Sequence, residues 1–205
     1  MAVITLSTAL GLARMSWSQQ RRDLAFDSIF GSQAVEVSGP RWMVSLAAPL
    51  MKEADAGAWQ ALLLRLAGKT NQLEVWNQMR AAPLGTMRGT MTLSGNHAQG
   101  AAALIITAGA GQAGTTLNAG DLLGLGSGIT QQVVMVLDDA TANGSGVITV
   151  NINPALRGAF SSGAAITWDQ PKALFRATSS RVDWEYAAGK IVKIGGLDLV
   201  EDWRS

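Results

Sequence analysis

One amphipathic segment, at about residues 52–67, constrains the fold more than any other part of the chain. Apolar residues recur there at positions i, i+3, i+4 and i+7, which is the spacing of one helix face. These residues are Trp59, Leu62, Leu63 and Leu66. Glu53 and Asp55 lie in the expected first turn, where the helix macrodipole favours negative charge, and Gly68 follows the last periodic residue. We therefore predict one long helix, roughly 24 Å in length.

The segments on either side of this helix have the pattern of strands. Residues 41–47 (RWMVSLA) alternate with a period of two, as a half-buried strand does, and residues 73–76 (LEVW) form a second expected strand. A lone amphipathic helix has to bury its apolar stripe against a sheet. We therefore predict a core shared by helix and strands, made of Trp42, Val44, Leu46, Trp59, Leu62, Leu63, Leu66 and Val75.

The two ends of the chain are expected to add further strands to this unit. Short strands are predicted at residues 3–7 and 14–18, on either side of a turn at Gly11. An irregular connection, with Phe26 and Phe30 as apolar anchors, is predicted to lead from there to residue 41. Near the C-terminus, the sequence predicts strands at about 174–186 and 190–200, joined near Ala188 and Gly189.

The composition changes between residues 81 and 171, where Gly, Ala, Thr and Asn are frequent and charges are rare. Turn residues divide this stretch into short apolar runs, which is typical of a small antiparallel barrel or sandwich. Strands are expected near 89–94, 102–107, 121–125, 131–137, 146–152 and 164–168. We therefore predict a mainly β protein with two domains. A discontinuous α+β domain comprises residues 1–80 and 172–205, and a small β domain, 81–171, is inserted into it.

Charge and cysteine content exclude several functions. Sixteen Lys and Arg residues against fifteen Asp and Glu give a net charge of +1, which argues against a dedicated nucleic-acid binder. The chain has no Cys, so disulfides, thiol catalysis and cysteine zinc sites are excluded. Only 15% of residues are charged, while 48% are hydrophobic. Either partner subunits cover much of the surface, or the chain has a large, turn-rich β core.

No targeting segment is evident in the sequence. The apolar N-terminal stretch lacks a preceding basic region, so no signal peptide is predicted. No apolar run approaches the 18 residues typical of a membrane span, so no membrane span is predicted. The protein is therefore expected to be soluble and not to be exported by the usual route.

The motifs that could support chemistry are weak. Residues 109–114 (GAGQAG) match the dinucleotide fingerprint, but the glycines that follow argue against the helix that this fingerprint needs. His97, the only histidine, is expected in a solvated turn. Asp138, Asp139 and Asn143 lack the spacing of a calcium-binding EF-hand loop. No catalytic, cofactor-binding or metal-binding residue is predicted, and the protein is not expected to be an enzyme.

Seven tryptophans raise the alternative of a carbohydrate-binding module, because indole rings stack on sugars. Trp42, Trp59 and Trp76 lie on the helix–strand unit, where core packing accounts for them. Trp168 and Trp203 lie near the ends of segments, so they are the candidates for contact with a ligand or a partner.

The order of several motifs resembles that of distal tail proteins of long-tailed, non-contractile bacteriophages. The basic-Trp-x-Val-x-Leu strand is residues 41–46 here, followed by Pro49 and a helix with Glu53-Ala54, Trp59 and its leucines. Residues 119–126 (AGDLLGLG), 141–150, 154–157 (PALR), 162–166 and 171–176 (PKALFR) are similar to later motifs of that family. Residues 71–79 (NQLEVWNQM) depart from it, since members often have a Gly- and aromatic-rich segment there.

The resemblance implies a structural virion protein without cofactors. Such proteins form a ring, usually of six copies, at the distal end of the tail tube. The ring links the tube to the baseplate hub and tape-measure proteins. By this resemblance, the first domain would be the ring-forming hub domain, and the inserted domain would carry fibres or contact a host-surface glycan. The expected location is the virion tail tip, after assembly in the host cytoplasm. The alternative is a carbohydrate-binding β-module on a virion or cell-surface protein.

Overall fold

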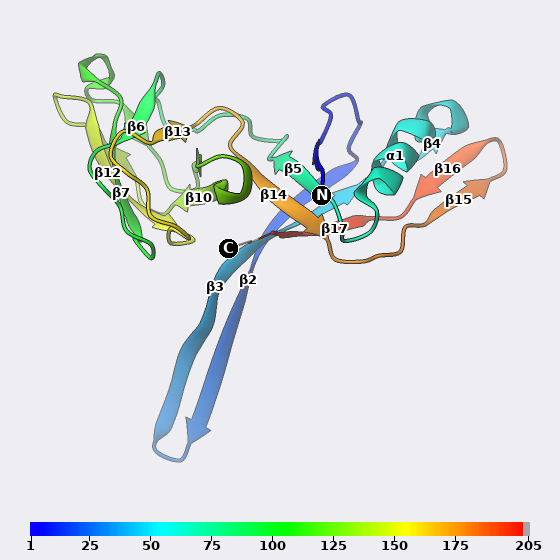
Figure 1. Cartoon of the computed structure of the whole chain (residues 1–205), viewed down its shortest axis with the longest axis horizontal. Helices are drawn as coiled ribbons and strands as arrows, with labels where there is room; N and C mark the ends of the chain where they lie inside the picture. Colours follow the sequence, from blue (N-terminus) through cyan, green and yellow to red (C-terminus); the bar gives the residue numbers. More distant parts are fainter. Residues whose placement is uncertain (203–205) are drawn as a thin grey trace. The chain divides into compact units, whose positions relative to one another are not determined.

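The structure, a computed structural model, describes residues 1–202 (Figure 1). These residues are mainly β, with one α-helix among them and a closed six-stranded barrel. The mainly β class is thus confirmed. The chain forms two compact units. Unit 1 contains Met1, Ala9–Asn71 and Arg176–Glu201, and unit 2 contains Ala2–Thr8, Gln72–Phe175 and Asp202. The domain bounds given above, at residues 80/81 and 171/172, differ from these divisions and stay a prediction.

The helix of unit 1, α1 (Glu53–Leu66), begins and ends within one residue of the prediction. It has 14 residues, which is an average length for a globular protein rather than a long one. Acidic Glu53 and Asp55 occupy the first turn, and Ala67 ends the helix in the left-handed conformation, with φ of 48°. The helix contacts β4 (Met51–Lys52) and β16 (Ile191–Ile194).

Unit 1 contains two groups of strands. One group has the order β15–β16–β4, in which β15 (Trp184–Ala187) pairs with β16 in antiparallel register. The other joins β2 (Arg14–Ser28), β3 (Gly31–Ala47) and β17 (Leu197–Glu201), also in antiparallel pairs. The C-terminal segment thus forms shorter strands than the two that were predicted, although the turn at Ala188 and Gly189 does join a hairpin.

The predicted irregular connection before residue 41 is wrong, because β2 and β3 form one long hairpin. We call its distal part, residues 22–38, the arm. The arm projects from the rest of unit 1 (Figure 1), and every residue from Gln20 to Gly39 is exposed. Phe26 and Phe30 are therefore exposed side chains and not the apolar anchors that were predicted.

A double bulge marks the start of the arm. Gln20 of β2 pairs with Arg41 of β3, and Asp23 pairs with Glu36. Between these two pairs β2 advances by three residues, whereas β3 advances by five. One extra residue of β3 lies at Gly39–Pro40 and the other is Val37. Bulges of this kind bend and twist a hairpin. Proline has no N–H for the ladder, which is why this stretch did not have the pattern of a regular strand.

Unit 2 contains the barrel, with the strand order β10–β12–β7–β6–β13–β9 and antiparallel pairs throughout. The predicted barrel or sandwich is therefore a barrel. The barrel strands are β6 (Met91–Leu93), β7 (Ala103–Thr107), β9 (Leu122–Leu125), β10 (Gln132–Val136), β12 (Val147–Asn153) and β13 (Ala165–Thr167). Each overlaps one of the six predicted strands, because alternating apolar residues fill the barrel core.

Five further strands of unit 2 pair outside the barrel. β1 (Val3–Thr5) runs parallel to β5 (Gln72–Trp76), and β5 pairs in antiparallel register with β14 (Lys172–Ala177), whose first four residues belong to this unit. A separate two-stranded ladder joins β8 (Thr116–Leu117) to β11 (Ala140–Thr141).

Candidate functional site

The structure buries all eight residues that were predicted to pack in a core. The helix residues among them lie within unit 1, and Trp59 also donates a hydrogen bond from Nε1 to the carbonyl oxygen of Gly11, at 3.1 Å. Val75 lies on β5 of unit 2. The buried residues are Trp42, Val44, Leu46, Trp59, Leu62, Leu63, Leu66 and Val75.

Trp168, a predicted contact residue, is half-buried and engaged within unit 2. Its Nε1 donates to the carbonyl oxygen of Gly89 at 2.7 Å, and the guanidinium of Arg88 lies 5.0 Å from its ring centroid. A ring covered by an arginine offers less surface for stacking on a sugar. Trp203, the other predicted contact residue, lies outside the residues that the structure describes.

The residues of the nucleotide-binding and calcium-binding motifs considered above form local turns and hydrogen bonds. Residues 109–114 form a 3₁₀ turn at Ala110–Gln112 with no α-helix after it, as expected. Asp138 accepts from Asn151 Nδ2 at 2.9 Å, and Asp139 accepts from the backbone N–H of Ala119 at 2.7 Å. Within residues 1–202, no three His, Asp or Glu side chains are grouped so that they could hold a metal ion.

The expectation that His97 is solvated is wrong, because the residue is only 9% exposed. Its Nε2 accepts a hydrogen bond from the backbone N–H of Ile105 at 3.0 Å, and its Nδ1 lies 3.2 Å from the carbonyl oxygen of Gly95. The imidazole therefore joins two segments of the barrel unit. Polar turn residues around His97 suggested solvent, but pairing of His97 with Phe160 buries it.

Asp121 is a fully buried carboxylate whose role the sequence did not reveal. Oδ1 accepts from Arg80 Nη2 at 2.6 Å and from the backbone N–H of Leu84 at 2.7 Å. Oδ2 accepts from the backbone N–H groups of Gly85 and Asn118, at 3.0 and 2.8 Å. These four bonds tie three segments of unit 2 together, so Asp121 is a structural residue.

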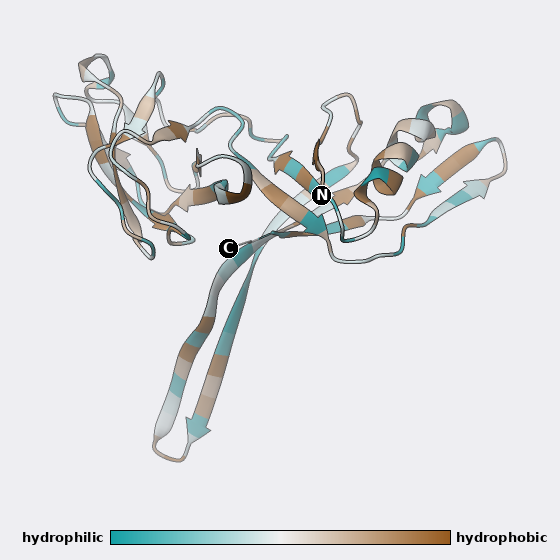
Figure 2. Ribbon diagram, in the orientation of Figure 1, coloured by the Kyte–Doolittle hydropathy of each residue, from teal (hydrophilic) through white to brown (hydrophobic). Residues whose placement is uncertain are grey.

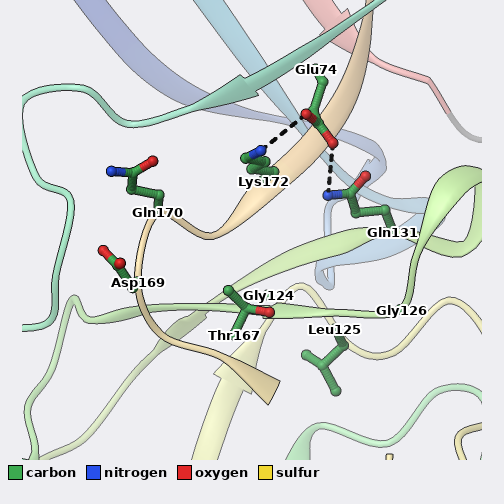
Figure 3. A pocket seen from close by; sticks show the side chains of 9 residues that line it. All are labelled: Glu74, Gly124, Leu125, Gly126, Gln131, Thr167, Asp169, Gln170 and Lys172. Carbon is green, nitrogen blue, oxygen red and sulfur yellow. Dashed lines mark hydrogen bonds and ion pairs between the residues drawn. The ribbon is translucent and has the colours of Figure 1, made fainter. Parts of the chain in front are cut away.

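A polar pocket of about 420 Å³ is the first candidate for a binding site (Figure 3). It lies within unit 2. Glu74, on β5, accepts from Lys172 Nζ at 3.2 Å and from Gln131 Nε2 at 3.5 Å. The exposed carboxylate of Asp169 lies on the segment between β13 and β14. The lining residues are Glu74, Gly124, Leu125, Gly126, Gln131, Thr167, Asp169, Gln170 and Lys172.

The arm is the second candidate site, because its two faces differ in chemistry. Residues opposite each other in an antiparallel pair share a face. Leu24 is opposite Val35, and Phe26 is opposite Gln33, so one face carries most of the apolar residues. We call it the apolar arm face. Asp23 is opposite Glu36 on the other face, and hydrophobic and hydrophilic residues alternate along the arm (Figure 2).

The tip of the arm is also apolar. Ile29 and Phe30 occupy the two turn positions, and each is 92% exposed. Tight hairpin turns favour Gly, Asn and Asp, so turn geometry does not account for two large apolar residues there. Ser28 stabilises the turn instead, since its Oγ accepts from the backbone N–H of Phe30 at 3.2 Å. The tip therefore adds two exposed apolar side chains to the arm.

Comparisons of the chain with protein-family models and with curated proteins found no match. None of the helices in the described part of the chain has the length and apolar character needed to cross a bilayer.

Proposed function

We propose that this protein is a structural subunit that assembles with copies of itself through the arm. The observation that supports this proposal is the exposed apolar surface of the arm, formed by the apolar arm face and the tip. Leu24 and Phe26 are 53% and 60% exposed there. An isolated two-stranded hairpin is marginally stable in water, and exposed apolar edges invite pairing with another chain. An arm about 20 Å long needs a partner surface to cover it.

The finer proposal is that the assembly is a ring at the distal end of a bacteriophage tail. The motif order of distal tail proteins supports it, and unit 1 is then the hub part that builds the ring, with six copies. In a closed ring every subunit uses two different surfaces, one of which the arm supplies. The ring would link the tail tube to the baseplate hub and tape-measure proteins at the virion tail tip. The barrel unit would carry fibres.

The proposal predicts that the tip residues are needed for assembly. The double variant Ile29→Ser with Phe30→Ser should shift the protein from an oligomer to a monomer, because both residues are exposed in the single chain and only a neighbour would bury them. Light scattering over a range of protein concentrations measures the mass, and negative-stain images show whether rings are present.

The matched control is Leu84→Ser with Ile129→Ser, which removes two similarly exposed apolar residues of unit 2. This control should assemble like the unchanged protein. A wild-type protein that stays monomeric at every concentration, or a tip variant that still forms rings, would count against the proposal.

A second candidate function is binding of a carbohydrate in the polar pocket of unit 2. Two carboxylates, two amides, a hydroxyl and an ammonium group line this pocket, and such groups match the hydroxyls of a sugar. A volume of about 420 Å³ lies in the range of small-molecule sites. A host-surface glycan would be the ligand in a tail protein.

Carbohydrate binding predicts a loss of affinity in the variant Asp169→Ala. This exposed carboxylate lines the pocket, so its removal should weaken binding of an array-identified sugar about tenfold, as the loss of a charged hydrogen bond does. Titration calorimetry measures the affinity, and Asp138→Ala, outside the pocket, is the control. A glycan array without signal above background for the full chain would remove this candidate.

A further inference from the structure

The side chain of His97 completes the edge of a barrel strand. β6 ends at Leu93, which is in register with Ile106, so β6 does not reach Ile105 of β7. The segment that follows β6 bonds with both main-chain groups of Ile105 instead. The carbonyl oxygen accepts from the N–H of Ser94 at 2.8 Å, and the N–H donates to Nε2 of His97 at 3.0 Å. The imidazole thus takes the place that a carbonyl group of a longer β6 would have.

These contacts determine which ring nitrogen of the neutral imidazole carries the proton. A backbone N–H can only donate, so Nε2 of His97 has to offer a free lone pair to Ile105. The proton is therefore on Nδ1, which lies 3.2 Å from the carbonyl oxygen of Gly95 and can donate to it. A proton on both nitrogens would set two donors against each other at Ile105. The bond from Ile105 therefore exists only while the imidazole is neutral.

His97 lies among uncharged segments of the barrel unit. Residues 89–120, which include β6, β7 and the connection between them, contain no Asp, Glu, Lys or Arg. The same is true of residues 158–168, which include Phe160, the backbone pairing partner of His97, and of β12, which pairs with β7. These segments therefore supply no carboxylate to balance an imidazolium that is only 9% exposed, and burial of an unbalanced charge is unfavourable.

Charged residues that border these segments have other contacts. Arg88 donates to main-chain carbonyl groups of the preceding loop, and Asp121 accepts the four hydrogen bonds described above. Arg157 donates to a main-chain carbonyl group, and its positive charge would repel a second cation. Asp138 accepts from a side chain of β12, on the side of β7 that is away from β6, and Asp169 lines the polar pocket.

We propose that His97 is a pH switch that opens one edge of the barrel in acid. Imidazole changes its charge between about pH 5 and pH 8, and the bond to Ile105 is lost when Nε2 takes up a proton. The connection between β6 and β7, residues 94–102, is then released from the edge of β7. The side chain of Phe160 packs against the barrel core, and its backbone is paired with that of His97, so this contact loosens in the same step.

The first test uses the full chain labelled with nitrogen-15. Because His97 is the only histidine, every imidazole signal in a long-range proton–nitrogen spectrum belongs to it. At about pH 7.5 the spectrum should show a protonated Nδ1 and an unprotonated Nε2. A neutral ring with its proton on Nε2 at this pH would overturn the proposal, and this measurement needs no variant.

The second test follows hydrogen exchange of the Ile105 amide. Its protection factor compares the measured exchange rate with that of an unfolded chain. This factor should fall about tenfold between about pH 7.5 and about pH 5.5, because the opened state takes up one proton that the closed state cannot bind. The amide of Val136 is the internal control, since it donates to the carbonyl oxygen of Asp121 at 2.8 Å on β10, which does not pair with β7. Its protection should change little.

Two variants separate the titration of the ring from the loss of the bond. In His97→Gln an amide oxygen can accept from the N–H of Ile105 at any pH, so the protection should stay high in acid. In His97→Ala the acceptor is absent, so the protection should be low at both pH values. Protection of Ile105 that acid does not lower in the unchanged protein, or that acid lowers equally in His97→Gln, would contradict the proposal. These results do not depend on whether the chain assembles through the arm or binds a sugar.

Discussion

Replacing Asp121 with alanine is expected to lower the free energy of unfolding by about 3–5 kcal/mol, because it removes one partner of a buried ion pair. The other partner, Arg80, would keep its charge in a largely enclosed site. The backbone N–H groups of Leu84, Gly85 and Asn118 would lose their acceptor in the same step. Urea unfolding followed by tryptophan fluorescence measures the change, because Trp168 lies in the same unit.

Two further variants separate charge from shape at this position. Asp121→Asn keeps the size of the side chain but can accept fewer hydrogen bonds, so its effect should be smaller than that of alanine. Asp169→Ala removes an exposed carboxylate of the same unit and should change the stability by less than about 0.5 kcal/mol. If Asp121→Ala and Asp169→Ala gave equal stabilities, the structural role of Asp121 would be wrong.

Trp59→Ala is expected to have a similar effect in unit 1, with a loss of about 3–5 kcal/mol. Trp59 is a fully buried residue on α1, and its indole N–H is satisfied by Gly11. Truncation would leave a large cavity under the helix and an acceptor without its donor. Thermal unfolding followed by circular dichroism at the helix minimum measures the loss.

Leu64→Ala is the control for this prediction, since Leu64 lies on the same helix but is 61% exposed. Both variants replace a large apolar residue by alanine, which has a high helix propensity. The melting temperature should fall strongly for Trp59→Ala and little for Leu64→Ala. A pair of equal melting temperatures would show that the buried face of the helix is assigned wrongly.

The parts of the fold that sequence patterns predicted well are those with one buried face. In α1, the i, i+3, i+4 spacing of Trp59 and its leucines follows directly from the side that packs on the sheet. In the barrel, strands such as β12 alternate because one side faces the core, and Ile148, Val150 and Ile152 of β12 are buried, whereas β9 is buried along its whole length. Periodicity records burial, so it locates such elements within a residue or two.

The arm was missed because it buries nothing. A strand that is exposed on both faces needs no alternation of apolar and polar residues, so its sequence does not differ clearly from that of a loop. Gly39 and Pro40 also interrupt the strand pattern at the bulge. The alternation of Asp23, Leu24, Ala25 and Phe26 was present in the sequence, as was its counterpart around Val35. The turn between the two strands is Ile29-Phe30, which lacks the Gly, Asn or Asp residues that usually indicate a tight hairpin turn.

The candidate sites depend on contacts between residues far apart in the chain. The polar pocket joins Glu74 to Lys172 and Gln131, and a second hollow, in unit 1, is lined by Arg22, Arg41 and Arg176. No local motif relates these positions. Asp121 is similar: its apolar neighbours identified a strand, but only the approach of Arg80 and of the backbone at Leu84 and Gly85 shows why a carboxylate can be buried there.

The sequence by itself determined the class of this protein: mainly β, with one helix and a set of short strands typical of a barrel or a sandwich. Those features depend on patterns of apolar and turn residues that are local in the chain, and local patterns can be read without a structure. Only the tertiary structure decided that residues 14–47 form one long hairpin, that His97 is buried, and that arginines gather where the arm begins. Those features arise from strand pairing and from long-range packing, which bring together residues that no local pattern connects.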